Sequence, residues 1–398
     1  MSPADGRNIL SNVIGERVNL GLGGGAAPRL SPAADARPCV LGMAREEIHA
    51  WLAQRGHKPY RADQLIEWVY DKGAASWDEM SNLPKPLRQW LADNAELRHA
   101  SVAADAIAED GTRKLLLRFP DGASVETVWI PSPRRHTVCV SSQVGCPVGC
   151  RFCASGLDGV VRNLSAAEIV EQALLIRGLI RAGSAAVATQ AADGPEVERG
   201  PERLTNIVLM GMGEPLANYR NVIKAVRIMN APWGLGVGAR KITISTVGLA
   251  RQIRDLAREE LQVNLSLSLH APDDELRRAL IPWRQDVPIA ELLDACHEYF
   301  RLTGREITLE YVLLEGLNDR PEHARKLAVI ARRIRANVNL LRYNPVPGLP
   351  FRRPSAEAAF AFQALLREQR VNVHVRTSRG SDVQAACGQL RRQTLPAS

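Results

Sequence analysis

Three cysteines lie close together in the segment CPVGCRFC, as Cys146, Cys150 and Cys153. Thiolates are the usual protein ligands of iron–sulfur clusters. Three thiolates on one loop can hold a cluster while its fourth iron keeps an open position, which can bind a substrate. A zinc site is the alternative, but zinc normally needs a fourth ligand or a second C-x2-C pair, and neither is nearby in the sequence. The spacing therefore predicts a [4Fe–4S] cluster on these residues.

Residues at the ends of several predicted β-strands could form a binding site. These positions are Gly213, Glu214, Ser245, Ser268, Leu269, His270 and Asn344. Glycine lets the backbone approach a ligand closely, and the Glu214 carboxylate could accept hydrogen bonds from an ammonium group. Each residue taken alone is also typical of a cap or a turn. Because parallel (β/α) barrels gather their active sites at the carboxyl ends of their strands, the whole set favours one site.

Three further residues are ambiguous when they are considered singly. Cys139 lies between valines in a predicted strand, and Cys387 follows two alanines in AACGQL. A cysteine in such surroundings is ordinarily a small buried hydrophobe. Glu126, in SVETVWIP, has the pattern of a solvent-facing strand residue.

An alternation of strands and helices must position these residues. Predicted strands occupy 136–142, 205–211, 241–246, 263–269, 306–314, 337–343 and 371–376. Amphipathic helices are predicted at 165–182, 218–230, 249–260, 289–303, 320–335 and 355–370. Six strand–helix units in succession predict an α/β fold with parallel strands. A closed barrel needs eight units, so we expect a partial (β/α)6 barrel over 136–392.

The chain before this barrel divides by composition. Residues 1–40 are rich in Gly, Ala, Pro and Ser and predict a disordered leader. Helical periodicity predicts an accessory domain over 41–100, and two apolar runs joined by Asp121-Gly122 predict a β-hairpin extension over 101–135. The segment 182–203 has few large apolar residues and predicts a flexible insertion, and 393–398 form a tail.

The composition describes an ordinary globular protein of 398 residues, 45% of them hydrophobic. It contains no run of roughly 20 apolar residues that could span a bilayer, and no apolar signal core near its start, so a cytoplasmic location is expected. The formal net charge of +8 suits a polyanionic partner such as RNA, although many basic proteins bind no nucleic acid. Seven cysteines, three of them clustered, indicate a metal rather than a disulfide framework.

Taken in order, these motifs resemble those of a known family. The three-cysteine spacing, with Phe152 before the last cysteine, resembles the radical S-adenosylmethionine (radical-SAM) signature. The series TVCVSSQVGCPVGCRFCASG, LMGMGEP, ISTVG, LSLHAP, YNP and AACGQL resembles the RlmN/Cfr family of RNA methyltransferases over roughly residues 42–392. The resemblance implies a radical-SAM partial barrel, one [4Fe–4S] cluster per chain and two molecules of S-adenosylmethionine per turnover. It also implies methylation of C2 of adenine 2503 in 23S rRNA and of adenine 37 in tRNA.

The resemblance also implies a role for each candidate residue. Cys387 would carry an S-methylcysteine intermediate, Cys139 would resolve it through a disulfide that frees the methylated base, and Glu126 would accept a proton. The seven strand-end residues named above would contact S-adenosylmethionine. Residues 41–100 would bind RNA, and flavodoxin or ferredoxin would supply electrons to a monomeric enzyme. Cys39 and Cys296 match no functional position and are interpreted as structural.

Three alternatives remain open. The family also contains enzymes that methylate C8 of the same rRNA adenine, and the motifs above are shared by both branches; we favour C2. A cluster-bearing RNA-binding factor without methyl transfer would require Cys139 and Cys387 to be incidental. A radical enzyme acting on a small molecule or a protein is the third alternative, and the basic N-terminal helical module argues against it.

Overall fold

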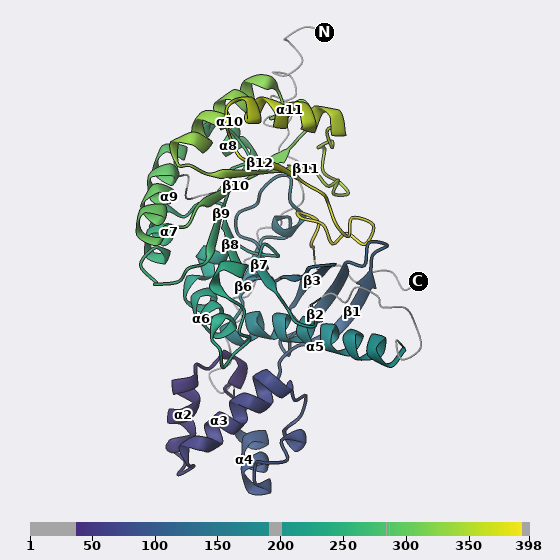
Figure 1. Cartoon of the computed structure of the whole chain (residues 1–398), viewed down its shortest axis with the longest axis vertical. Helices are drawn as coiled ribbons and strands as arrows, with labels where there is room; N and C mark the ends of the chain where they lie inside the picture. The colour runs from purple at the N-terminus through teal and green to yellow at the C-terminus, as the bar shows by residue number, and fades with distance from the viewer. Residues whose placement is uncertain (1–36, 191–200, 284, 286, 392–398) are drawn as a thin grey trace. The chain divides into compact units, whose positions relative to one another are not determined.

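The computed structural model describes residues 37–190, 201–283, 285 and 287–391, which form an α/β fold (Figure 1). These residues cluster into two compact units, each discontinuous in sequence. The N-terminal unit contains the described residues of 31–144, 162–243 and 391–398, and the C-terminal unit contains those of 145–161 and 244–390. Among the described helices, none is long and apolar enough to cross a membrane.

A small helical module begins the N-terminal unit and appears in purple and blue in Figure 1. Its elements are η1 (Val40–Gly42), α2 (Arg45–Ala53), α3 (Pro59–Ile66), η2 (Glu67–Lys72), η3 (Trp77–Glu79) and α4 (Lys85–Asn94). Ile48, Leu52, Leu65 and Leu91 are fully buried here, as the helical periodicity predicted. The predicted leader reaches too far, because Cys39 and Val40 are also buried; residues 1–36 lie outside the described chain.

The sheet of the N-terminal unit follows this module. It has the order β1 (Ser101–Ile107), β2 (Arg113–Arg118), β3 (Ser124–Ser132), β4 (Arg135–Cys139) and β7 (Asn206–Leu209). The first four strands pair antiparallel and β4 pairs parallel with β7. The predicted β2–β3 hairpin is confirmed, with Gly122 at φ 81° in its turn. Strand β1 was not predicted, because its exposed residues lack the alternating apolar pattern of a half-buried strand.

The remaining helices of this unit are α5 (Ala166–Gln190), η6 (Pro215–Asn218), α6 (Tyr219–Asn230) and η7 (Ala239–Lys241). Helix α5 packs against α6 and η1. It continues to Gln190, whereas the sequence predicted an end at 182 and a flexible insertion beyond it. The extension is rich in alanine, which favours helix without supplying large apolar residues. Residues 191–200 of the predicted insertion, and the predicted tail at 393–398, lie outside the described chain.

The C-terminal unit alternates strands and helices. Its strands are β8 (Ile242–Thr246, begun in the other unit), β9 (Asn264–Ser268), β10 (Ile307–Leu313), β11 (Asn337–Arg342) and β12 (Val373–Arg376). Its helices are α7 (Ala250–Leu256), α8 (Asp274–Leu280), α9 (Ile289–Thr303), α10 (Pro321–Arg333) and α11 (Ala356–Glu368). Strands β9 to β12 pair parallel in register with their neighbours, and Figure 1 shows α7, α9, α10 and α11 along the outer side of these strands. All strands of the predicted series are confirmed, while α8 was not predicted.

Candidate functional site

The cysteine loop belongs to the C-terminal unit. It follows β5 (Gln143–Gly145), contains η4 (Ala154–Gly156) and leads into β6 (Val160–Asn163), which pairs with β5. Gly145 has φ 78°, and a Cβ there would stand 2.0 Å from the carbonyl oxygen of Gly159, so only glycine fits. The backbone N–H of Cys146 donates to that carbonyl at 3.0 Å. The loop is thus anchored by its backbone at the residue where the cysteine motif begins.

The three cysteines of the motif are half-buried and pack against one apolar cluster. The cluster includes Val148, Phe152 and Ala154 of the loop together with Ala271, Leu280, Val312, Tyr343 and Phe351. Burial raises the pKa of the Cys153 thiol, and the nearby Cys387 thiol adds a smaller rise. A thiolate at Cys153 is therefore costly unless a cation compensates it, which a cluster iron would do.

This donor set fits an iron–sulfur cluster. The three thiols lie on one loop and pack against apolar side chains. This arrangement suits a cluster that is held by thiolates and shielded from water on one side. Among the described residues, no three His, Cys, Asp or Glu side chains gather closely enough to hold a single metal ion. A cluster differs in this respect, because each thiolate binds a different iron.

His270 lies beside the same loop in a strained backbone conformation. Its φ is 57°, in the left-handed region that non-glycine residues rarely adopt, and the Asn318 side chain donates to its carbonyl at 2.9 Å. The imidazole contacts the Phe152 ring edge to face at 5.0 Å between centroids. Its Nδ1 accepts a hydrogen bond from the Val312 N–H at 3.0 Å. Burial, with a smaller effect of Arg277, lowers the pKa of His270 to about 3, so the ring is neutral and its Nε2 carries the proton.

Two predicted serines meet at neighbouring strand ends. The hydroxyl oxygens of Ser245 on β8 and Ser268 on β9 are 3.4 Å apart, close enough to share a polar ligand. Leu269 follows Ser268, but its side chain is fully buried and its backbone N–H donates to the Glu310 carbonyl at 3.1 Å. Any ligand contact of Leu269 would therefore involve its backbone.

The segment that carries Cys387 is held against the cysteine loop within the C-terminal unit. The Ala154 N–H donates to the Gly388 carbonyl at 2.7 Å, and the Ser155 hydroxyl donates to the Leu390 carbonyl at 2.8 Å. The Asn344 side-chain amide donates to the Cys387 carbonyl at 3.1 Å. The Cys387 side chain itself is exposed, unlike that of an ordinary apolar cysteine. The predicted residues Asn344 and Cys387 are thus brought together beside the cluster loop.

The side-chain oxygen of Asn344 is buried and accepts no hydrogen bond from any described residue. A buried acceptor without a donor is unfavourable by about 1–3 kcal/mol, so this atom is suited to a ligand that brings a donor.

The GMGEP loop lies in the N-terminal unit. Gly213 has φ 104°, and a Cβ there would stand 2.7 Å from the Ser142 hydroxyl, so this position requires glycine. Glu214 is buried; its backbone N–H donates to the Gln143 side chain at 2.8 Å, and its carboxylate caps η6 by accepting from the Leu216 N–H at 3.0 Å. The loop is therefore rigid, and Gln143 is a supporting residue that the sequence did not reveal.

Cys139 and Glu126 lie in the sheet of the N-terminal unit. Cys139 ends β4 opposite Val128 and is 7% exposed. Glu126 on β3 is 1% exposed, so the expectation of a solvent-facing carboxylate is wrong: both faces of this hairpin strand are covered. Its carboxylate pairs with the Lys114 ammonium at 3.1 Å and accepts a hydrogen bond from the Arg391 N–H at 2.9 Å.

Lys114 and the Arg391 backbone are partners that sequence reasoning missed. The hairpin register places Lys114 opposite Val128, two residues from Glu126 on the same face of the sheet. The Asp121-Gly122 turn fixes that register, so the turn signal could have revealed the Lys114 pair. Nothing local in the sequence indicates the Arg391 contact, because it is 265 residues away.

Comparison with known proteins assigns the family. The family model "Ribosomal RNA large subunit methyltransferase N-terminal domain" matches residues 40–97, and the model "Radical SAM superfamily" matches residues 194–328. The chain is 46% identical to "Probable dual-specificity RNA methyltransferase RlmN 3" of Opitutus terrae, over 90% of this chain and 96% of the relative. It is 44% identical to "Dual-specificity RNA methyltransferase RlmN" of Syntrophobacter fumaroxidans, over 88% and 97%. The chain belongs to the RlmN family.

A solved structure agrees with this RlmN assignment. A radical SAM methyltransferase from Sphaerobacter thermophilus matches with a TM-score of 0.81 and 43% identity, over 89% of this chain and 100% of that one. The predicted radical-SAM α/β fold is therefore confirmed, and the chain is a radical-SAM methyltransferase. Such an enzyme uses a [4Fe–4S] cluster and S-adenosylmethionine.

The cysteines of this RlmN-family chain fall into distinct classes. Cys39 and Cys296 are buried, and burial raises the pKa of each thiol to about 12, in keeping with a structural role. All seven cysteines lie in the described residues, and none is in a disulfide. A Cys139–Cys387 disulfide is thus a step of the proposed reaction and not a feature of this structure.

Proposed function

We propose that this chain methylates C2 of an adenine in RNA, namely adenine 2503 of 23S rRNA and adenine 37 of tRNA. The observation that carries the proposal is the exposed Cys387, whose carbonyl accepts a hydrogen bond from Asn344 and whose segment binds the backbone of the cysteine loop. An exposed thiol fixed beside a cluster loop is suited to accept a methyl group and present it to a substrate. An incidental cysteine next to alanines would be buried.

Cys146, Cys150 and Cys153 would hold the [4Fe–4S] cluster, and two molecules of S-adenosylmethionine would be consumed per turnover. The cluster and S-adenosylmethionine together supply a methyl group and a radical. We assign contacts with S-adenosylmethionine to Gly213, Glu214, Ser245, Ser268, Leu269, His270 and Asn344. The neutral His270 offers an Nε2–H donor, the serine hydroxyls donate and accept, and the Asn344 oxygen is an acceptor that needs a donor.

Three side chains would act on the methyl group and the base. The Cys387 sulfur carries the methyl group as S-methylcysteine. One hydrogen atom is removed from that group by the radical, and its carbon becomes bonded to C2 of adenine; the unpaired electron left on the base would return to the electron-transfer centre. Glu126 accepts the proton that leaves the base; its carboxylate lies 3.1 Å from the Lys114 ammonium. Cys139 then attacks the Cys387 sulfur as a thiolate. The disulfide forms while the bond between that sulfur and the transferred carbon breaks, and the released carbon takes up a proton to become the methyl group of the adenine.

The other parts of the chain would serve the RNA and the electron supply. We assign residues 41–100 as an RNA-binding accessory domain and 101–135 as the β-hairpin extension that carries Glu126. The barrel is assigned to 136–392. A flavodoxin or ferredoxin would reduce the cluster of a cytoplasmic, monomeric enzyme. Light scattering of the purified protein tests the monomer, and a dimeric mass would contradict it.

The test is methyl transfer by the reconstituted enzyme. After anaerobic assembly of the cluster, the protein is incubated with S-adenosylmethionine, a reductant and either an rRNA fragment or tRNA, and the nucleosides are analysed by mass spectrometry. We expect 2-methyladenosine in both RNAs. Formation of 8-methyladenosine would assign the C8 reaction instead, and absence of both products with an intact cluster would contradict the proposal.

A further inference from the structure

A pocket of about 880 Å³ in the N-terminal unit is strongly basic, and the site described above does not use it. It lies among α3 and η2 of the helical module, the β3–β4 turn, α5 and the segments 201–206 and 232–241. Six arginines and one lysine line it, against three carboxylates. Its volume is at the large end of the roughly 300–1,000 Å³ that is usual for ligand sites.

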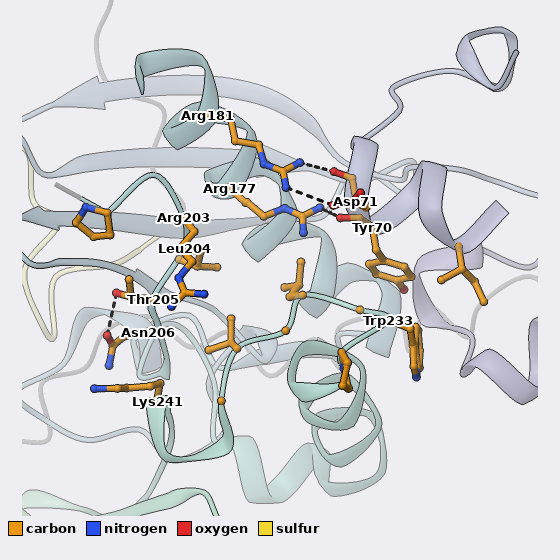
Figure 2. A pocket seen from close by; sticks show the side chains of 18 of the residues that line it. Tyr70, Asp71, Arg177, Arg181, Arg203, Leu204, Thr205, Asn206, Trp233 and Lys241 are labelled. Atoms are coloured by element: carbon orange, nitrogen blue, oxygen red, sulfur yellow. Dashed lines mark hydrogen bonds and ion pairs between the residues drawn. The ribbon is translucent and has the colours of Figure 1, made fainter. Parts of the chain in front are cut away.

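Each of the three carboxylates of the pocket already has a basic partner. Asp63 pairs with Arg45 at 2.8 Å, which together with His49 lowers the pKa of the Asp63 carboxyl although partial burial opposes this. Glu67 pairs with Lys72 at 2.9 Å. Asp71 pairs with Arg181 at 3.9 Å, as the dashed lines in Figure 2 indicate. The acidic side chains therefore do not balance the remaining cations.

Four of the cations are exposed and have no carboxylate partner within the described chain: Arg134, Arg135, Arg203 and Lys241. Figure 2 shows both Arg203 and Lys241 on the side of the view away from Trp233. A fifth, Arg177, is buried and donates to the Tyr70 carbonyl, and burial lowers the pKa of its guanidinium to about 10. Its charge remains at neutral pH, so an anion in the pocket would meet several uncompensated cations.

One wall of the pocket is aromatic. The half-buried Trp233 indole contacts the Tyr70 ring edge to face at 5.6 Å between centroids. Tyr70 is fully buried and donates through its hydroxyl to the Leu41 carbonyl at 3.0 Å, so it is a fixed support for the indole. A supported aromatic ring beside arginines is the usual composition of a single-stranded nucleic-acid site, where bases stack and phosphates pair.

We propose that this pocket, defined by Arg134, Arg135, Arg203, Lys241 and Trp233, binds unpaired RNA. The four cations would contact successive phosphates and Trp233 would stack on one base. This inference rests on the proposed RNA substrate. The concave shape and the aromatic wall favour an RNA strand over the flat acidic surface of a protein electron donor, which would need only the exposed charges.

The test uses the reconstituted full chain and a fluorescein-labelled RNA hairpin of the target sequence. The double variant Arg203→Gln/Lys241→Gln removes two exposed charges, and Trp233→Ala removes the aromatic wall. Binding is followed by fluorescence anisotropy from 50 to 300 mM salt. We expect the charge variant to bind about tenfold more weakly, with a slope of log Kd against log salt lower by about 1.4–1.8, since each lost phosphate contact removes about 0.7–0.9. Trp233→Ala should weaken binding about tenfold with an unchanged slope.

The matched control is Arg325→Gln/Arg332→Gln. Both arginines are exposed on α10, have no ion pair within the described residues and lie outside the pocket, so the net charge changes equally. The RNA affinity of this control variant should stay within about twofold of the wild-type value. Its slope of log Kd against log salt should change less than that of the pocket charge variant. Equal losses in the control and the pocket variant would overturn the inference, because they would show that only total charge matters. Thermal unfolding verifies that each variant is folded.

Methyl transfer by the same samples separates this inference from the proposed function. If the wild-type protein forms the methylated product and the pocket variants bind RNA with unchanged affinity, the inference about the pocket is overturned and the proposed function stands. If the wild-type protein forms no product, the proposed function is contradicted. Reduction by dithionite is compared with reduction by flavodoxin. A loss of activity seen only with flavodoxin, at unchanged RNA affinity, would assign the pocket to the electron donor and overturn the RNA inference.

Discussion

The two cysteines that we propose act on the methyl group, Cys387 and Cys139, occupy opposite environments. Cys387 is exposed on an irregular segment, whose carbonyls accept hydrogen bonds from Asn344, Ala154 and Ser155. Cys139 is 7% exposed and ends a strand that is paired on both sides. The exposed environment suits a sulfur that must accept a methyl group and present it to a substrate. The buried environment suits a thiol that is shielded from solvent and reacts only with the Cys387 sulfur. The difference matches the two roles that we propose for these cysteines, which the sequence context alone would not separate.

Replacing Cys387 tests the exposed side of this comparison. Cys387→Ala should abolish methylated adenosine, by about 10³-fold or more, because no other exposed thiol can carry the methyl group. The cluster absorbance should persist, since Cys387 lies outside the motif. Cys296→Ala is the control: this fully buried cysteine should cost about 1 kcal/mol of stability and leave turnover unchanged. Retained activity in Cys387→Ala would remove the distinction between the two cysteines.

Replacing Cys139 tests the buried side. Cys139→Ala should still allow the bond between the Cys387-borne carbon and adenine to form, but not its release. We therefore expect a covalent protein–RNA species on denaturing gels and a loss of multiple turnover. The species should disappear in Cys139→Ala/Cys387→Ala. If the single variant releases free methylated RNA at the wild-type rate, Cys139 is not the resolving thiol.

The stability contribution of the Lys114–Glu126 ion pair tests whether the sheet around Cys139 is shielded from water. With side chains 5% and 1% exposed, the loss of one partner leaves a buried charge, so Glu126→Gln should lower the free energy of unfolding by about 3–5 kcal/mol. Glu126→Gln/Lys114→Met should recover most of it. In the exposed pair Arg333–Asp294, at 3.0 Å, Asp294→Asn should cost less than about 1 kcal/mol. Urea titration gives these values, and equal losses at both pairs would show that the Glu126 region is open to water.

The smallest expected effect is the contribution of His270 to the pH dependence of folding stability. Its pKa in the folded protein is about 3, below the ordinary value of 6.5. Between these two values the imidazole is protonated in the unfolded chain but neutral in the folded protein. This contribution to stability is complete above pH 6.5 and is lost as the pH falls toward 3, with about 2 kcal/mol lost between pH 6.5 and 5. His270→Gln should lack this part of the pH dependence in urea titrations. The same slope in both proteins would contradict a buried neutral imidazole.

Much of this architecture could be predicted from the sequence because it depends on local patterns. The strand series, the Asp121-Gly122 hairpin and the cysteine motif are each encoded within a few residues. Strand β1 could not be predicted, since an exposed edge strand needs no apolar face. The burial of Glu126 depends on Lys114 and Arg391, the latter far away in the chain. The segment that carries the exposed Cys387 is held by hydrogen bonds to its backbone carbonyls from distant residues such as Asn344, and the local sequence does not reveal these bonds.

Cys387 is the residue that we propose carries the methyl group. The most direct measurement is peptide mass spectrometry of the protein, after incubation with S-adenosylmethionine whose methyl group is deuterated, with an RNA whose methylation is followed in parallel. We predict a deuterated methyl group on Cys387, none on Cys139, and label from that group in the methylated adenine. Labelled adenine from a protein in which Cys387 never carries the methyl group would contradict the account.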